Sequence, residues 1–186
     1  MDLKCIDHIS GWLSLPEAAF LAGLAGQVPV GQAIVEIGTY CGRSAVALAH
    51  GARPGVRVYA VDPHLEGIPT CPDPGPKQQA ELYRHIVDSE KGEIISVVSL
   101  RSAEAAAAWK VRGEPIGMLW IDGCHTYEAV RTDLDCWLPM VVSDGIVVVH
   151  DVLLTAEFPG IGRAVAETPS ILPIAHCGSA VRYRLV

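Results

Sequence analysis

Short runs of β-branched and other apolar residues alternate along the chain with longer segments that favour helices. The apolar runs cover residues 33–37, 56–62, 94–100, 116–122 and 145–151. Helix-forming segments separate these runs, and such alternation is typical of parallel strands that are joined by helices. We therefore expect an α/β fold with one doubly wound sheet and helices on both faces, whose ligands lie beyond the carboxyl ends of the strands.

The two ends of the chain add a helix and a hairpin to this prediction. Pro16 follows Ser14 at the start of an alanine-rich segment that Gly26 can end, which predicts a helix over one edge or face of the sheet. A Gly-Ser turn separates residues 171–176 from residues 181–186, which predicts a terminal antiparallel hairpin. The sheet should contain about five parallel strands and this hairpin.

A length of 186 residues is that of one compact domain. We expect a single domain over residues 1–186, with an N-terminal helical segment over residues 1–30. Half of the residues are apolar and 19% are charged, a composition that supports a sizeable core. A proline-rich stretch from His64 to Lys77 predicts a long loop, and with the segment before Gly11 it is the main candidate for substrate specificity.

Charge and cysteine usage narrow the possible partners and location. The net charge is −7 without a Lys or Arg run, which disfavours a general nucleic-acid or membrane-surface binder and favours a small-molecule partner. The longest apolar runs fall far short of the roughly 20 residues that cross a bilayer. Six cysteines form no C-x-x-C pair, and the N-terminus lacks the apolar segment of a signal peptide. We expect reduced thiols and a cytoplasmic protein.

A glycine turn follows the first predicted strand, where Gly38 and Gly42 would let the backbone approach a ligand closely. The dinucleotide fingerprint G-x-G-x-x-G is absent because Tyr40 and Arg43 occupy two of its glycine positions, and no G-K-[ST] follows as in a P-loop. Glu36 places a carboxylate beside the turn, which would repel a pyrophosphate and favour a positively charged ligand. S-adenosylmethionine, with its amine and sulfonium, is such a ligand.

Asp62 and Ser102 follow the second and third predicted strands at the same edge of the sheet. Asp62 lies 24 positions after Gly38, near the spacing at which an acidic residue binds ribose hydroxyls in doubly wound folds. An aspartate before proline also forms turns without any ligand. Ser102 has two interpretations, a helix cap with Ala103 as the first helical residue or an adenine contact.

Acidic and imidazole side chains gather where the fourth and fifth predicted strands end. Asp122 ends one strand, and His150 and Asp151 end the next, so these side chains can converge on a metal ion or serve as a general base. His125 is a second candidate base, because histidine titrates near neutral pH. Each residue also has a structural explanation, such as a charge at a helix N-terminus. Cys124 could act as a thiolate or zinc ligand, but no second cysteine lies at ligand spacing.

The segment Ile121-Asp122-Gly123-Cys124-His125-Thr126-Tyr127, with Val130 and Asp133 and a later His150-Asp151 pair, resembles class I S-adenosylmethionine-dependent methyltransferases. It is similar to a short group with an I/V-D-G-x-H-x-Y motif, and the opening V-E-I-G-T-Y-C-G-R-S is similar to that group's first motif. The resemblance covers the chain from about Gly11 onward. It implies a Rossmann-like sheet of about seven strands with the last strand inserted antiparallel.

The resemblance also implies roles for individual residues. The methionine part of the cofactor would lie near Glu36, Gly38, Thr39, Gly42 and Ser44. Asp62 would bind the ribose and Ser102 would lie near the adenine, with Asp122 also bordering the cofactor. Metal-dependent relatives hold magnesium at the fourth and fifth strand ends, which implies Asp122, Asp151 and the neighbouring His150 as ligands. A nitrogen ligand such as His150 favours manganese over magnesium.

These observations favour methyl transfer from S-adenosylmethionine to a small-molecule acceptor, with an oxygen as the acceptor atom and Asp122, His125 and Asp151 as catalytic residues. A divalent metal (Mg or Mn) is optional in this hypothesis, and a homo-oligomer that closes the site is left open. One alternative is a non-catalytic cofactor-binding or accessory module of the same fold. Another is a hydrolase that uses Cys124 or Ser102, although the G-x-S-x-G elbow is absent.

Overall fold

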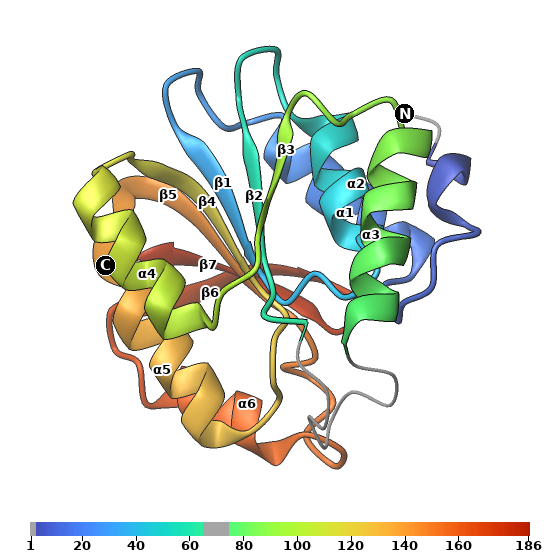
Figure 1. The fold of residues 1–186 in the computed structure, drawn as a ribbon. Helices are drawn as coiled ribbons and strands as arrows, with labels where there is room; N and C mark the ends of the chain where they lie inside the picture. The colour runs from blue at the N-terminus through green and yellow to red at the C-terminus, as the bar shows by residue number, and fades with distance from the viewer. Residues whose placement is uncertain (1–2, 65–74) are drawn as a thin grey trace.

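The computed structural model describes residues 3–64 and 75–186, and within them a seven-stranded sheet in the order β3-β2-β1-β4-β5-β7-β6 (Figure 1). The strands are β1 (Ala33–Ile37), β2 (Val58–Val61), β3 (Ile95–Val98), β4 (Ile116–Ile121), β5 (Val141–Val149), β6 (Ile171–Cys177) and β7 (Ala180–Leu185). Strands β1 to β5 pair in parallel, whereas β7 lies antiparallel between β5 and β6. This confirms the predicted doubly wound, Rossmann-like sheet and its antiparallel C-terminal hairpin.

Helices cover both faces of this sheet (Figure 1). The helices are α1 (Leu15–Ala25), α2 (Arg43–Gly51), α3 (Pro76–Asp88), α4 (Ser102–Arg112), α5 (Tyr127–Trp137) and α6 (Pro159–Ala166), with short 3₁₀ turns η1 (Lys4–Ile6) and η2 (Leu138–Met140). One core packs α1, α2 and α3 against the sheet around Trp120, and the other packs α4, α5 and α6 around Trp137. Strand β5 begins at Val141, directly after η2 and four residues before the run that the sequence predicted.

The register of the parallel strands aligns their carboxyl ends. Ile37 at the end of β1 pairs with Val61 of β2 and with Ile121 of β4, and Ile121 pairs with Val149 of β5. The four residues that follow these strands therefore lie in one row at the edge of the sheet. They are Gly38, Asp62, Asp122 and His150.

Helix α1 has the boundaries that its sequence predicts. Ser14 caps the helix and Glu17 completes a capping box, in which the Ser14 side chain accepts from the Glu17 N–H and the Glu17 carboxylate accepts from the Ser14 N–H. Gly26 follows the last turn. The helix packs against α2, and both belong to the core on one face of the sheet.

The segment before α1 is held by the guanidinium of Arg43, the first residue of α2. This side chain donates to the carbonyl oxygens of Ile6 at 2.6 Å, Ile9 at 2.8 Å and Leu13 at 2.7 Å. A fixed cationic fork that binds three carbonyls positions the N-terminal segment beside the glycine turn, where Trp12 contacts Tyr40 with ring centroids 5.3 Å apart.

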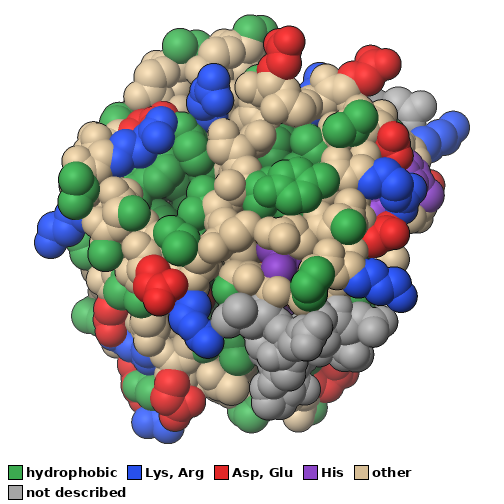
Figure 2. All heavy atoms as spheres, viewed as in Figure 1, with side chains coloured by type: hydrophobic (Ala, Val, Ile, Leu, Met, Phe, Trp, Pro, Cys, Tyr) green, Lys and Arg blue, Asp and Glu red, His purple; other side chains and the backbone are tan. Residues whose placement is uncertain are grey.

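Charged and hydrophobic side chains are both exposed at the surface (Figure 2). On the face drawn in Figure 2, described Lys and Arg side chains are scattered among acidic ones. In the described part of the chain, no helix has the length and apolar character that crossing a membrane requires. The five cysteines in the described ranges, at positions 5, 41, 124, 136 and 177, form no disulfide with one another. Most of the predicted proline-rich loop, residues 65–74, lies outside the described residues.

Candidate functional site

The glycine turn after β1 is shaped by packing inside the protein. Gly38 has φ +85°, and a Cβ there would lie 2.3 Å from the carbonyl oxygen of Asp122 and 2.7 Å from the Cα of Gly123. Gly42 has φ +90°, and a Cβ there would lie 2.5 Å from Leu82 Cδ1. The structure requires both glycines for positive φ and for contact with neighbouring elements, and their close approach to a ligand stays a prediction. The turn after β1 thus rests directly on the turn after β4.

Glu36 is the one acidic side chain inside β1, and it is fully buried. Ser44 at the start of α2 donates a hydrogen bond to Glu36 Oε1, whereas Glu36 Oε2 has no hydrogen-bond partner. Burial raises the pKa of Glu36 to about 8, so the carboxyl group is mostly protonated at neutral pH. A cationic group that approaches the turn would favour the ionised form and so restore the predicted negative charge.

Asp62 holds the glycine turn in place. Its Oδ2 accepts from the backbone N–H groups of Thr39 at 3.1 Å and Tyr40 at 3.0 Å, and its Oδ1 accepts from the N–H of His64 at 2.9 Å. Tyr40 and His64 both have positive φ, at 49° and 46°. A carboxylate has about four acceptor sites, so one remains for a ligand hydroxyl. The turn-forming interpretation of Asp62 thus extends to the glycine turn after β1, and its ribose contact stays a prediction.

Ser102 lies at the carboxyl edge as predicted, but its hydroxyl has a protein partner. It is the first residue of α4, and Arg101 rather than Ser102 is the cap. The indole Nε1 of Trp137 donates to Ser102 Oγ at 2.9 Å. Burial raises the pKa of the neighbouring Asp133 to about 6, although a hydrogen bond from Ser102 lowers it. Ser102 thus joins α4 to α5, and its adenine contact stays a prediction.

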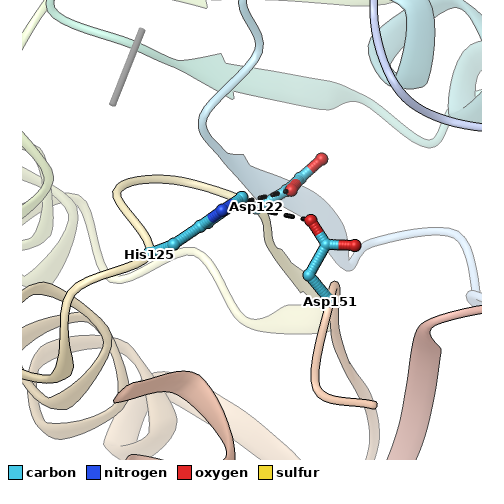
Figure 3. A group of neighbouring side chains, drawn as sticks. All are labelled: Asp122, His125 and Asp151. Carbon is cyan, nitrogen blue, oxygen red and sulfur yellow. Dashed lines mark ion pairs between the residues drawn. The ribbon is translucent and has the colours of Figure 1, made fainter. Parts of the chain in front are cut away.

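The carboxyl ends of β4 and β5 bring Asp122, His125 and Asp151 together (Figure 3). One ligand atom of each residue lies within 4.8 Å of the others. His125 Nε2 is 3.6 Å from Asp122 Oδ1 and 3.9 Å from Asp151 Oδ2. The ring of Phe158 packs edge-on against the imidazole of His125, with centroids 4.4 Å apart. The sequence predicted this convergence, because the three residues follow neighbouring strands.

His150 lies behind this group and contacts three carboxylates. Its Nδ1 is 3.0 Å from Asp122 Oδ1 and 3.6 Å from Asp151 Oδ2, and its Nε2 is 3.4 Å from Glu17 Oε1. Burial lowers the pKa of His150, but the three carboxylates outweigh burial and raise it to about 9. In the structure His150 is thus an ion-pair partner of these carboxylates, and its role as a metal ligand stays a prediction.

The charge of His150 also keeps its neighbours ionised. Burial raises the pKa of Asp122, but His150 and His125 lower it below its usual value. Burial likewise raises the pKa of Glu17, yet hydrogen bonds from Ser14 and Ser179 and the charge of His150 lower it to about 2. Three carboxylates, those of Asp122, Asp151 and Glu17, thus surround one imidazolium.

The sequence interpretation missed two residues in the surroundings of His150 and Asp151, namely Glu17 and Ser179. The S-x-x-E capping signal marks Glu17 as a helix residue and gives no hint of a second role. Ser179 belongs to the predicted hairpin turn. Cys124 is one candidate nucleophile of the hydrolase alternative. In the structure its Sγ donates a hydrogen bond to Thr126 Oγ1 at 3.8 Å.

Comparison with known proteins identifies the family. A family model described as "Methyltransferase domain" matches residues 35–152. The solved structures that share the fold include cofactor-bound Rv0187 from MTB, with TM-score 0.75, 19% identity, and coverage of 98% of this chain and 87% of that one.

Two further solved structures are similar. An O-methyltransferase from Bacillus cereus in complex with SAH has TM-score 0.70 and 17% identity. The match covers 94% of this chain and 83% of the Bacillus cereus chain. The O-methyltransferase TomG from Streptomyces achromogenes in complex with SAM has TM-score 0.72 and 16% identity. The match covers 94% of this chain and 81% of TomG. At these identities the likeness establishes the fold, whereas the family model spans more than half of the chain. The protein therefore belongs to the methyltransferase domain family.

Proposed function

We propose that this protein transfers a methyl group from S-adenosylmethionine to an oxygen atom of a small molecule. The observation that carries the proposal is the contact between the two predicted half-sites. Gly38 of the cofactor turn packs on the backbone of Asp122 and Gly123, and Asp122 belongs to the acidic group with His125 and Asp151. A donor at the first turn would thus face an acceptor at the second. The O-methyltransferases among the structural neighbours support the same reaction class.

The residues around the glycine turn fit S-adenosylmethionine. Glu36 Oε2 is buried without a hydrogen-bond partner, so the amine of the methionine part would find an acceptor beside the turn. Asp62 retains one acceptor site for a ribose hydroxyl. In this proposal Thr39, Gly42 and Ser44 border the methionine part, and Ser102 lies near the adenine.

The chemistry needs little from the protein beyond alignment and proton removal. S-adenosylmethionine supplies a methyl group on a sulfonium, which is already a good leaving group. His125 Nε2 would accept the proton of the acceptor hydroxyl as its oxygen attacks the methyl carbon. Asp122 and Asp151, at 3.6 Å and 3.9 Å from that nitrogen, would stabilise the imidazolium that forms. Phe158 holds the ring of His125 in place.

A divalent cation is the second way to activate the acceptor, and the donor set fits one. Asp122, His125 and Asp151 would hold it, since each offers one ligand atom to the same point. Two carboxylates and one imidazole suit manganese better than magnesium. A bound cation would lower the pKa of the acceptor hydroxyl. A manganese soak with anomalous scattering separates the two versions. A peak between the three residues favours the metal, and its absence at millimolar manganese favours His125 as the base.

Calorimetric titration with S-adenosylmethionine tests the proposal. We expect binding to the wild type, much weaker binding to Asp62→Ala, and wild-type affinity for Asp144→Ala, whose side chain is exposed outside the site. No binding to the wild type would refute the proposal. Incubation of a cell extract with methyl-labelled cofactor, followed by mass spectrometry, then identifies the acceptor. A protein that binds the cofactor but labels no product would instead be a binding module of the same fold.

A further inference from the structure

The carboxylate of Asp151 is held in an unusual conformation. Asp151 has φ +53°, in the left-handed region that side-chain-bearing residues rarely adopt, and its side chain is nearly buried. Its two oxygens have different surroundings. Oδ1 accepts a hydrogen bond from Ser179 Oγ at 2.8 Å, whereas Oδ2 faces His150 at 3.6 Å and His125 at 3.9 Å. Residues in such conformations persist only where their surroundings hold them, and they cluster at functional sites.

Ser179 is in turn fixed by Glu17, which lies 162 positions earlier in the chain. Glu17 Oε1 is 2.9 Å from the Ser179 backbone nitrogen and 3.0 Å from the Ser179 hydroxyl. The hydroxyl carries one proton, so it can donate to one carboxylate at a time. Because the backbone N–H already serves Glu17, the shorter contact assigns the hydroxyl proton to Asp151.

The carboxylate of Glu17 is itself immobilised. Its Oε2 accepts from Ser14 Oγ at 2.6 Å and from the Ser14 N–H at 3.0 Å. A Cβ on Gly178, which has φ +56°, would lie 2.4 Å from Glu17 Oε1, so the carboxylate rests against the backbone of the β6–β7 turn. Glu17 is 5% exposed. A stable α1 does not require this contact, because the capping box uses only Oε2.

We propose that Ser179, fixed by Glu17, is a positioning residue that turns Asp151 Oδ2 toward His125 for the methyl-transfer reaction. The inference rests on the proposed function and adds residues from α1 and the C-terminal hairpin to the site. Neither residue touches the reacting atoms. Both act through Asp151, whose free oxygen completes the group with Asp122 and His125.

Crystal structures and kinetics of Ser179→Ala test this role, with Ser179→Thr as the conservative variant and Ser170→Ala as the control at an exposed serine before β6. In Ser179→Ala we expect the Asp151 carboxylate to rotate away from His125. With the acceptor identified as above, kcat should fall about tenfold or more, because small misplacements at reacting centres are costly. The dissociation constant for S-adenosylmethionine should change less than about twofold. Ser179→Thr should restore both placement and kcat, and Ser170→Ala should alter neither.

An unmoved Asp151 carboxylate in Ser179→Ala would overturn the inference, as would a kcat that Ser179→Thr does not restore. A parallel loss of kcat, cofactor affinity and thermal stability would also overturn it, since that pattern indicates a general structural role. Glu17→Gln is the second variant should Ser179→Ala not fold, and it should lower kcat in the same way. If the wild type fails to bind S-adenosylmethionine, the proposed function falls, while the crystal structures still decide whether Ser179 places Asp151.

Discussion

Two acidic residues border the glycine turn, and their surroundings give them different roles. Asp62 accepts hydrogen bonds from three backbone N–H groups, which make it a fixed part of the turn. Glu36 receives one hydroxyl and is fully buried, so its pKa rises to about 8. A neutral carboxyl inside a strand costs far less than a buried charge. The site can therefore hold Glu36 without a ligand and still ionise it when a cation arrives.

We predict that S-adenosylmethionine binding at pH 7 releases a proton from Glu36. The free protein holds this proton because the pKa is about 8, and a cationic ligand would favour the ionised carboxylate. Calorimetry in buffers of different ionisation enthalpy should indicate release of about one proton per ligand, fading above pH 9. Glu36→Gln should bind without proton release. An observed enthalpy that is the same in every buffer for the wild type would contradict this assignment.

His125 should matter for turnover and not for cofactor binding. Its Nε2 lies between Asp122 and Asp151, in the part of the site proposed for the methyl acceptor. His125→Gln should lower kcat by about 10²- to 10⁴-fold, the usual contribution of a general base, with an unchanged dissociation constant for S-adenosylmethionine. His176→Gln, at an exposed position on β6, is the matched control and should behave like the wild type. A normal kcat in His125→Gln would exclude His125 as base or ligand.

At the scale of elements, the strands were predictable from sequence because their patterns are local. Alternating apolar runs located β1 to β5, and strand ends located Asp62 and Asp122 at the carboxyl edge. The parallel register then brings the residues after β1, β2, β4 and β5 into one row. Contacts between elements could not be predicted in this way, because they leave no local pattern in the sequence. Examples are the hydrogen bond that Ser102 accepts from Trp137 and the packing of Gly38 on the backbone of Asp122.

The contact between α1 and α2 depends on a glycine that local patterns do not explain. A Cβ on Gly51, at the end of α2, would lie 2.0 Å from the carbonyl oxygen of Ala22 in α1, whereas a Cβ on Gly23 of α1 would meet nothing within 4 Å. Gly51→Ala must push the two backbones apart and should lower the free energy of unfolding by about 1–3 kcal/mol. Gly23→Ala should raise it by about 0.5–1 kcal/mol, because alanine favours helices.

Urea unfolding of the two alanine variants measures this difference directly. The midpoint should shift to lower urea for Gly51→Ala and to higher urea for Gly23→Ala, with similar slopes. Equal shifts in the two variants would mean that the helices adjust without cost, and would count against close packing of α1 on α2.

At the scale of the whole molecule, the first helix and the last hairpin meet behind the acidic group. Glu17 binds Ser179, and His150 lies between Glu17 and Asp122. Sequence reasoning placed α1 on the sheet but could not place it beside the hairpin turn, because contacts between segments so distant in sequence leave no periodic signal. Helix α1 and the β6–β7 turn thus support the acidic group at the carboxyl ends of β4 and β5.

The pH dependence of folding stability should reflect the buried Glu36. Its folded pKa of about 8 exceeds the ordinary value of 4.5, so the folded state keeps a proton that the unfolded state loses. This contribution is fully present below pH 4.5 and is lost as the pH rises through about 8, with a slope near 1.4 kcal/mol per pH unit for one proton. Glu17 acts oppositely, since its pKa is lowered to about 2 and its contribution is lost only as the pH falls below about 4.5.

Urea unfolding between pH 5 and 8, without ligand, separates the contribution of Glu36 from the others. Across this range Glu17 contributes a constant amount. Asp133 and His150, whose pKa values are raised to about 6 and about 9, should titrate alike in the wild type and in Glu36→Gln. The difference between the two proteins therefore isolates Glu36. We expect the wild type to lose stability with rising pH more steeply than Glu36→Gln. Parallel curves would mean that Glu36 is ionised in the folded protein, and the proton release predicted for cofactor binding would then fail with it.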